Sequence, residues 1–332
     1  MVAVVIPTLE SGDVLLECLE GLRCQTRTDF EIIIVDNSGR GQARGFASTS
    51  PPVRVIANDC NVGFGAAINQ GCRASAAEYV AALNDDAVPC PEWLDQLVAA
   101  MESSPRVGMC ASRVLLQETG LLDSAGMLIA ADASSKQRGH REPPAAYDQP
   151  ADVLLPSGSA ALYRRAMFDK IGGFAEEFFL YCEDTDLGLR GRWAGWECRY
   201  APGAIVEHRY SHSSGRASAL KAYFVERNRL FMAVRNLPLM SLLAVPAASA
   251  GRYAWHVWYL FAGHGAAAEF AGGGRAWRLP WYVLRAWASV LLHLPRLLAE
   301  RRAIRRSASL TSDEFRRLLR RHSISLRQVA SL

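Results

Sequence analysis

Two groups of acidic side chains stand far apart in this chain of 332 residues. Asn84-Asp85-Asp86 ends the apolar run 79–83, and Glu183-Asp184-Thr185-Asp186 follows the aromatic run 178–181. Open α/β sheets bind ligands at the carboxyl ends of their strands, and hard oxygen ligands there suit Mg²⁺ or Mn²⁺ holding phosphates. The two groups together therefore indicate a metal and a base that act on a nucleotide-linked substrate.

Short β-branched runs alternate with helical patterns in the first part of the chain. Strands are expected at residues 2–6, 31–35, 53–56 and 79–83, with helices at 14–25 and 66–77. Strands that are joined through helices pair in parallel. The pattern predicts a nucleotide-binding α/β half in which the first acidic group follows the fourth strand.

The middle of the chain has fewer regular patterns. Helices are expected at 93–101 and 184–193, and a strand at about 107–112. Regular structure is expected to resume at 157–163, and residues 205–208 form a β-like run. The Gly-, Ala- and Asp-rich stretch 123–152 shows little periodicity, so we expect a mobile loop or lid there.

The two parts of the chain carry opposite net charge. Residues 1–215 contain 18 Lys and Arg against 28 Asp and Glu, whereas residues 216–332 contain 19 against 5. Opposite signs indicate different partners for the two parts.

From about residue 223 the chain becomes aromatic and basic. Five of the eight tryptophans lie there among apolar runs that single arginines interrupt: Trp255, Trp258, Trp277, Trp281 and Trp287. No run reaches the roughly 20 apolar residues that a spanning helix needs, so interfacial helices fit better. Paired arginines at 301–302, 305–306, 316–317 and 320–321 could contact anionic lipid. An ordinary helical core with a solvated basic face is the alternative.

Cysteine spacing and the start of the chain bear on its compartment. The eight cysteines lack CxxC spacing, and we interpret them as reduced. The first residues have no basic region before a short apolar stretch, which differs from a signal peptide. We therefore expect a cytoplasmic protein.

Five motifs follow one another along the first part of the chain: Ile6-Pro7-Thr8, Val35-Asp36-Asn37, Asn61-x-Gly63-Phe64-Gly65 with Asn69-x-Gly71, Leu83-Asn84-Asp85-Asp86, and Glu183-Asp184-x-Asp186-Leu187. In this order and spacing they resemble the family 2 inverting glycosyltransferases of GT-A fold. The resemblance covers about residues 1–230. Three further motifs resemble the subgroup that includes bacterial rhamnosyltransferases: Pro156-Ser157-Gly158, Gly172-Gly173-Phe174 and Glu226-Arg227-Asn228.

The resemblance implies which residues contact the nucleotide-sugar donor. It assigns Asp36 to the nucleotide, although a turn or helix-capping role would explain this aspartate equally well. Thr8 and Glu10 line the first loop, where ordinary loop polar residues are the alternative. The full set of expected donor contacts is Pro7, Thr8, Glu10, Asp36, Asn61, Gly63, Asn84 and Asp85.

The resemblance also implies a metal site. Asp86 matches the second acid of the family's DxD motif, and Asn84 stands where the first acid often lies. Asp86 is expected to hold Mg²⁺ or Mn²⁺ that bridges the donor diphosphate, with Asp85 as a possible substitute. His208 is expected to help hold the metal, and His212 to belong to a loop over the donor.

The second acidic group carries the expected general base. By resemblance Asp184 removes the acceptor hydroxyl proton, and Glu183 is the second candidate. Any one of these acids could instead stabilise the start of a helix.

Other classes of protein fit less well. Gly63-x-Gly65 follows the third strand and lacks a third glycine, which disfavours a dehydrogenase. Arg192-Trp193 matches part of the signature of processive synthases, but the preceding Gln is missing. A nucleotidyltransferase should carry a lysine in its first loop, whereas residues 9–12 have none. A catalytically inactive nucleotide-sugar-binding or scaffold protein should lack Asp86 or Asp184, and both are present. These last two alternatives stay open.

The sequence therefore predicts an α/β fold of GT-A type followed by a helical extension. Residues 1–222 would form the catalytic domain, with a nucleotide-sugar half at 1–112 and an acceptor half at 113–222, and residues 223–332 would associate with a membrane surface. The expected donor is a nucleotide-diphospho-sugar, with dTDP-rhamnose as a candidate, and the acceptor a lipid-linked glycan of the cell envelope. We expect an enzyme bound to the cytoplasmic membrane face, with no nucleic-acid partner, and leave homo-oligomer formation open.

Overall fold

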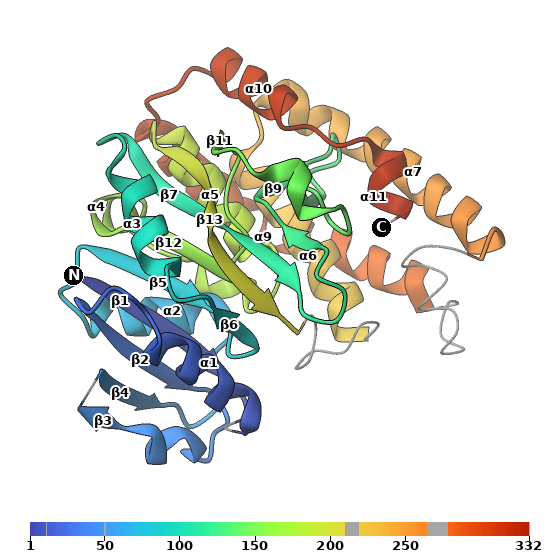
Figure 1. The fold of residues 1–332 in the computed structure, drawn as a ribbon. Helices are drawn as coiled ribbons and strands as arrows, with labels where there is room; N and C mark the ends of the chain where they lie inside the picture. The colour runs from blue at the N-terminus through green and yellow to red at the C-terminus, as the bar shows by residue number, and fades with distance from the viewer. Residues whose placement is uncertain (11, 50, 210–218, 264–277, 332) are drawn as a thin grey trace. The chain divides into compact units, whose positions relative to one another are not determined.

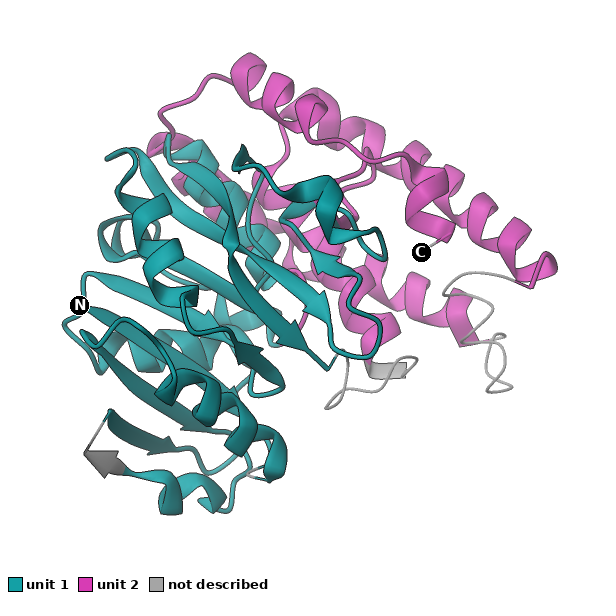
Figure 2. Cartoon of the chain, viewed as in Figure 1, with its two compact units in different colours: residues 1–127, 137–179, 183–213 teal, residues 128–136, 180–182, 214–332 magenta. Residues whose placement is uncertain are grey.

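The computed structural model describes residues 1–10, 12–49, 51–209, 219–263 and 278–331. The chain divides into two units (Figure 2): unit 1 contains 1–127, 137–179 and 183–213, and unit 2 contains 128–136, 180–182 and 214–332. The predicted boundary at residue 222 lies inside helix α6 (Ala219–Asn236). The division into catalytic and membrane-associating domains stays a prediction.

Unit 1 is built on one large mixed sheet with the strand order β11-β13-β7-β12-β5-β1-β2-β4-β3 (Figure 1). Strands β4, β2, β1 and β5 pair in parallel, which confirms the predicted parallel α/β half. Strand β12 is antiparallel to both β5 and β7, while β13 pairs with β7 in parallel. The bounds are β1 (Val2–Thr8), β2 (Phe30–Asp36), β3 (Ser48–Thr49), β4 (Pro52–Ala57), β5 (Tyr79–Leu83), β6 (Ala87–Pro89), β7 (Val107–Leu116), β8 (Leu122–Ser124), β11 (Ala151–Asp152), β12 (Ala160–Arg164) and β13 (Glu197–His208).

Helices cover both faces of this sheet because its strands are apolar on both sides. Along β1, Val2, Val4 and Ile6 enter one core, and Ala3 and Val5 enter the other, as the alternation of strand side chains requires. The first core contains α1 (Asp13–Arg23) and α3 (Trp93–Glu102). The second contains α2 (Phe64–Arg73), α4 (Arg165–Ile171) and α5 (Glu183–Trp193). Buried strands thus read as continuous apolar runs.

Helix α2 lies unusually close to β1. It also ends earlier than expected. A Cβ atom at Gly71 would lie 2.3 Å from Cγ1 of Val5, so only glycine allows this approach. The predicted helix to Ala77 stops at Arg73 because the guanidinium of Arg165 donates to the carbonyls of Cys72, Ser75 and Ala77. That side chain satisfies backbone acceptors that a longer helix would otherwise pair.

The expectation of a mobile loop at 123–152 is wrong. This stretch forms β8, β9 (Met127–Ile129), β10 (Ser135–Gln137), the 3-10 turn η2 (Pro144–Tyr147) and β11. Its aspartates Asp123 and Asp132 are buried. Strands of two or three residues are too short to show a period, and the buried acids are paired with residues far away in the sequence.

The C-terminal part of unit 2 is helical, which confirms the predicted C-terminal helices. It contains α6, α7 (Leu239–Phe261), α9 (Leu279–Arg306), α10 (Ser312–Arg321) and α11 (Leu326–Ser331). Helix α6 packs along α9, and α11 packs on α7. Among the described residues, no helix combines the length and the apolar character needed to cross a bilayer.

The cysteines are free thiols, as expected. Cys18, Cys72, Cys110 and Cys198 are buried, whereas Cys24 and Cys60 are exposed. Burial raises the pKa of the Cys110 thiol to about 12, which keeps this group protonated.

Candidate active site

The carboxyl ends of three neighbouring parallel strands carry the polar residues that the sequence singles out. Strand β1 ends at Thr8 beside Asp36, the last residue of β2. Strand β5, on the other side of β1, ends at Leu83 and is followed by the acidic turn that contains Asn84 and Asp86. The first acidic group therefore follows a strand end, as predicted.

Asp86 lies against His208 at the end of β13. Strand β6, which follows the acidic turn, pairs antiparallel with β13 and sets His208 opposite Ala87. The carboxylate Oδ1 of Asp86 is 3.1 Å from Nε2 of His208, and both side chains are buried. The amide nitrogen of Asn84 lies 3.3 Å from the same Nε2. Two residues that the sequence assigned to a metal are thus brought together.

A second carboxylate, Asp123, holds the other side of the His208 ring. Its Oδ2 is 3.0 Å from Nδ1 of His208, and its Oδ1 is 3.2 Å from Nδ1 of His140. Burial opposes the charge on His208, but the hydrogen bonds and charges of Asp123 and Asp86 prevail and raise its pKa to about 10. Sequence reasoning missed Asp123, because its place in an aperiodic stretch gives no local signal.

Asp184 is partly exposed as a residue, and backbone amides hold its carboxylate. Gly158 N donates to Oδ2 at 3.0 Å, and Thr185 N donates to Oδ1 at 2.6 Å. Desolvation is the largest influence on this carboxyl and raises its pKa, against the lowering effect of these hydrogen bonds. A raised pKa in an oriented carboxylate suits a general base.

The neighbouring acids differ from Asp184. Glu183 is buried, its Oε2 has no hydrogen-bond partner, and burial together with the charge of Asp184 raises its pKa to about 8. Asp186 forms a buried ion pair of 2.7 Å with Arg190, which in turn donates to the carbonyls of Ile171 and Gly173. Asp186 therefore fixes the end of α4.

One loop links the two acidic groups. Asn84 N donates to the carbonyl of Ser159 at 2.9 Å, and the amide of the preceding Gly158 binds Asp184. This loop precedes β12, the strand that lies between β5 and β7. The insertion of β12 thus gathers both groups into one site within unit 1.

The expected donor contacts lie in the same unit. Both oxygens of Asp36 accept backbone N–H groups at 2.8 Å, from Ser38 and Ala43. Burial opposes its charge, but these hydrogen bonds lower its pKa, so Asp36 is ionised. These contacts match the alternative in which Asp36 stabilises a turn, and contact of Asp36 with a nucleotide stays a prediction. In the first loop Thr8 is buried and donates to the carbonyl of Glu10, whose side chain is exposed, and Pro7 is half-buried.

The glycine motif after β4 approaches the second acidic group. The side chain of Asn61 accepts the N–H of Gly63 at 2.8 Å, and Gly63 has a φ of 88°. A Cβ atom there would lie 2.4 Å from the carbonyl oxygen of Phe179, which accepts the N–H of Phe64. Asn69 supports this region by pairing with both the N–H and the carbonyl of Phe174.

Two residues from the sequence analysis, His212 and Trp277, lie outside the described residues. Within the described part of the chain, no set of three or more His, Cys, Asp or Glu side chains is arranged to hold a metal ion. The protein side of any metal site there would rest on the Asp86 and His208 pair.

Comparison with known sequences identifies relatives of this chain. The model of the family "Glycosyl transferase family 2" matches residues 3–172. The chain is 30% identical over 263 residues to an N-acetylglucosaminyl-diphospho-decaprenol L-rhamnosyltransferase of Mycobacterium tuberculosis, which spans 70% of this chain and 84% of that protein. It is 27% identical over 201 residues to the O-antigen biosynthesis protein RfbC of Myxococcus xanthus, covering 57% of this chain and 16% of that one.

Comparison with solved structures supports the predicted GT-A fold. GalNAc-T7 with UDP, GalNAc and Mn²⁺ gives a TM-score of 0.57 at 14% identity, over 70% of this chain and 47% of that one. The mannosyltransferase PcManGT from Pyrobaculum calidifontis with GDP-Man and Mn²⁺ gives 0.51 at 19% identity, over 87% and 86%. Identities this low show the fold alone.

The buried Glu183 leads to a prediction about stability and pH. Its folded pKa of about 8 exceeds the value of about 4.3 for an exposed glutamate, so between these pH values only the unfolded chain releases the proton. The free energy of unfolding should therefore fall as the pH rises through this window. Urea titrations at about pH 5 and pH 8 measure this decrease in the free energy of unfolding. In Glu183→Gln it should be smaller than in the unaltered protein by on the order of 1–4 kcal/mol.

The exposed Glu118 provides the control, because Glu118→Gln should leave the pH dependence unchanged. If Glu183→Gln retained the full decrease of the unaltered protein, the raised pKa of Glu183 would be wrong.

Proposed function

The chain belongs to glycosyl transferase family 2, and from that premise we propose an inverting enzyme that moves one sugar from a nucleotide-diphospho-sugar to a lipid-linked glycan. The observation that carries the proposal is the Asp184 carboxylate. The residue is partly exposed, its carboxylate is oriented by Gly158 and Thr185, and the loop 157–159 links it to the acidic turn that contains Asp86.

In the proposed reaction Asp184 is the base. Its carboxylate takes the proton of an acceptor hydroxyl while that oxygen forms a bond to the anomeric carbon of the donor. The bond from the anomeric carbon to the diphosphate oxygen breaks at the same time, and the nucleoside diphosphate leaves with the electron pair. Attack from the face opposite the leaving group inverts the configuration of the sugar.

We assign Asp86 and His208 as the residues that would hold Mg²⁺ or Mn²⁺. The donor set fits once His208 releases its Nε2 proton, because this nitrogen and a carboxylate oxygen lie 3.1 Å apart. Asp123 binds the other ring nitrogen, as carboxylates do for metal-binding histidines. Mg²⁺ is commonly held by one or two protein ligands plus substrate phosphates, so two residues suffice. When bound, the cation would offset the charge of the leaving diphosphate.

The relatives suggest the donor and acceptor classes. The mycobacterial relative is named as an L-rhamnosyltransferase that acts on a diphospho-decaprenol glycan, and the Myxococcus relative as an O-antigen biosynthesis protein. We therefore propose an activated deoxyhexose such as dTDP-rhamnose as donor, a prenyl-diphosphate glycan as acceptor, and a role in cell-envelope glycan synthesis.

Unit 2 has the properties of a membrane-docking surface. Of the thirteen exposed large hydrophobic side chains in the described residues, ten lie on α7 and α9: Leu239, Met240, Leu243, Val257, Trp258, Phe261, Trp281, Leu284, Leu291 and Leu292. The only Lys, Arg, Asp or Glu in α7 is Arg252, which is buried. The exposed face of α7 therefore carries no such charge.

The occupant that we propose for this face is an anionic lipid bilayer. Residues 216–332 contain 14 more basic than acidic residues, and each basic residue near an anionic surface adds about 1 kcal/mol of attraction. An apolar face in a segment with an excess of basic residues suits a helix that lies in the lipid interface. This docking would bring the enzyme to its lipid-linked acceptor at the cytoplasmic membrane face.

Replacement of the base should abolish transfer. In Asp184→Asn, release of nucleotide from a panel of nucleotide sugars, with a membrane lipid extract as acceptor, should fall by about 10²–10⁴-fold because the amide cannot take the proton. Asp169→Asn, which removes an exposed carboxylate from α4, should retain activity. Equal activity of Asp184→Asn and the unaltered protein would refute the assigned base.

The two acids of the first group should differ in metal binding. Asp86→Asn should weaken Mn²⁺ binding, measured by titration calorimetry in the presence of nucleoside diphosphate, by about 10-fold or more, since a carboxylate ligand is lost. Asp85→Asn is the matched variant and should change the Kd by less than about threefold, because Asp86 is the acid that faces His208. A larger loss of Mn²⁺ affinity in Asp85→Asn than in Asp86→Asn would assign the metal to Asp85.

The apolar face of α7 should govern vesicle binding. The double variant Trp258→Glu with Phe261→Glu should lower co-sedimentation with phosphatidylglycerol vesicles by at least about 10-fold, because two apolar contacts become charged. Leu16→Glu, an exposed apolar position on α1 in unit 1, is the control. Unchanged vesicle binding, or a change in oligomeric state alone, would assign the face to a protein partner.

A further inference from the structure

The residues directly before Glu183 and Asp184 have an unfavourable backbone. Phe179, Tyr181 and Cys182 have φ values of 62°, 71° and 63°, although none of them is glycine. Such conformations are unfavourable for residues that carry a Cβ atom and persist only where surrounding contacts impose them. Specific contacts must therefore hold this segment.

Asn228 of helix α6 supplies two of these contacts. Its Nδ2 donates to the carbonyl of Leu180 at 2.7 Å and to the carbonyl of Tyr181 at 2.8 Å. The side chain is fully buried, and Nε of Arg227 donates to its Oδ1 at 2.8 Å, which fixes the orientation of the amide. A single amide group thus holds two successive carbonyls of the strained segment.

Other residues on the same face of α6 contact the segment. Lys221, Val225 and Asn228 are spaced by four and three residues, so they share one face of the helix. The ammonium of Lys221 lies 5.8 Å from the centre of the Tyr181 ring, and the thiol of Cys182 is 3.9 Å from the carbonyl of Val225. Residues 180–182 therefore follow the position of α6.

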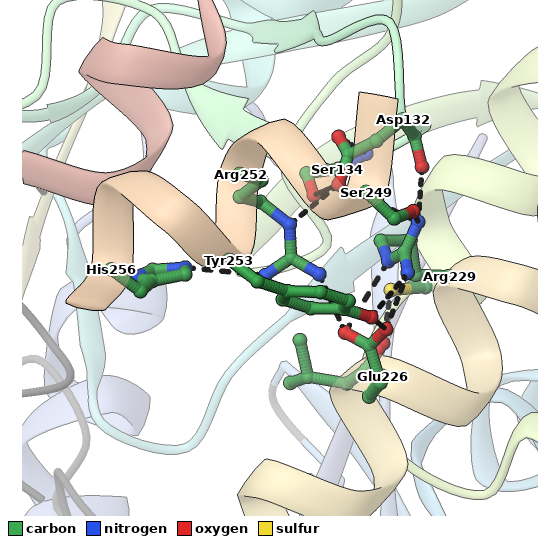
Figure 3. A network of polar contacts seen from close by, with 10 residues as sticks. Asp132, Ser134, Glu226, Arg229, Ser249, Arg252, Tyr253 and His256 are labelled. Carbon is green, nitrogen blue, oxygen red and sulfur yellow. Dashed lines mark hydrogen bonds and ion pairs between the residues drawn. The ribbon is translucent and has the colours of Figure 1, made fainter. Parts of the chain in front are cut away.

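A buried ionic network in unit 2 fixes α6 itself (Figure 3). Glu226 lies two residues before Asn228 and pairs with Arg252 of α7 at 2.7 Å. Arg229 directly follows Asn228 and pairs with both Glu226 and Asp132. Burial opposes the charge on Glu226, but Arg229 and Arg252 prevail and lower its pKa to about 2. Separating the partners of a buried ion pair leaves an uncompensated buried charge, so this network resists a shift of α6 along α7.

We propose that Asn228 is a positioning residue for the base: by holding the carbonyls of Leu180 and Tyr181, it sets the backbone that continues directly into Glu183 and Asp184. The inference rests on the proposed function, in which Asp184 is the base. Asn228 touches neither donor nor acceptor in this assignment. Its loss should therefore affect the orientation of the carboxylate and leave donor binding intact.

The kinetic test compares two buried asparagines of α6. Asn228→Ala should lower kcat for the consumed donor by about 10–100-fold, since a displacement of about 1 Å in a catalytic group has an effect of this size. The KM for the donor should stay within about twofold. Asn236→Ala is the matched control, because Asn236 is equally buried and its amide donates to Met232 of its own helix at 3.2 Å. It should destabilise the protein without this loss of kcat.

A second test reports on the backbone without any activity. Hydrogen exchange of the peptide that covers residues 180–185 should become at least about 10-fold faster in Asn228→Ala and remain unchanged in Asn236→Ala. This measurement keeps the inference testable if no donor is consumed by the unaltered protein, an outcome that would count against the proposed function alone.

A rescue variant separates positioning from general destabilisation. The glycine of Cys182→Gly adopts a φ of 63° without strain. The double variant Asn228→Ala with Cys182→Gly should therefore regain at least part of the lost kcat and of the lost protection from hydrogen exchange. The double variant also serves if Asn228→Ala fails to fold. Unchanged exchange at 180–185 with unchanged kcat in Asn228→Ala, or a loss that Asn236→Ala shares equally, would overturn the inference.

Discussion

The hydrogen bond from the amide of Gly158 to the carboxylate of Asp184 is the interaction on which the site depends. It forms because β12 lies between β5 and β7, which brings the loop before β12 to the end of β5. The same loop accepts the amide of Asn84, and a Cβ atom at Gly158 would lie 3.3 Å from Cβ of Asp184. Both acidic groups are therefore positioned by one short loop, and it contains glycine at the point of closest contact.

Residues of the sequence motifs separate into those that face the site and those that support it. In the proposed function Asp184 and Asp86 belong to the first kind. Asn69, Gly71 and Asp186 belong to the second, because they fix a loop to α2, allow α2 to approach β1, and anchor Arg190 at the end of α4. A motif can therefore mark chemistry and also the packing that holds the chemistry in place.

The parallel half of the sheet and the location of the acidic groups could be predicted from the sequence because their signals are local. An apolar run that ends on carboxylates, as at Asp86, identifies a strand and its carboxyl end. The ordered stretch 123–152 could not be predicted in this way. The buried Asp123 pairs with His208, which lies 85 residues later, and no pattern around Asp123 indicates that pairing. The turn contacts of Asp36 were likewise one of two alternatives that spacing could not separate.

The central claim is that Asp184 removes a proton from an acceptor that attacks opposite the leaving diphosphate. The most direct measurement is the anomeric configuration of the product, determined by NMR for whichever nucleotide sugar the enzyme consumes. A single displacement with one base predicts that every product molecule has the configuration opposite to that of the donor. Retention of the donor configuration would contradict the account, because it requires two successive displacements or a different attacking face.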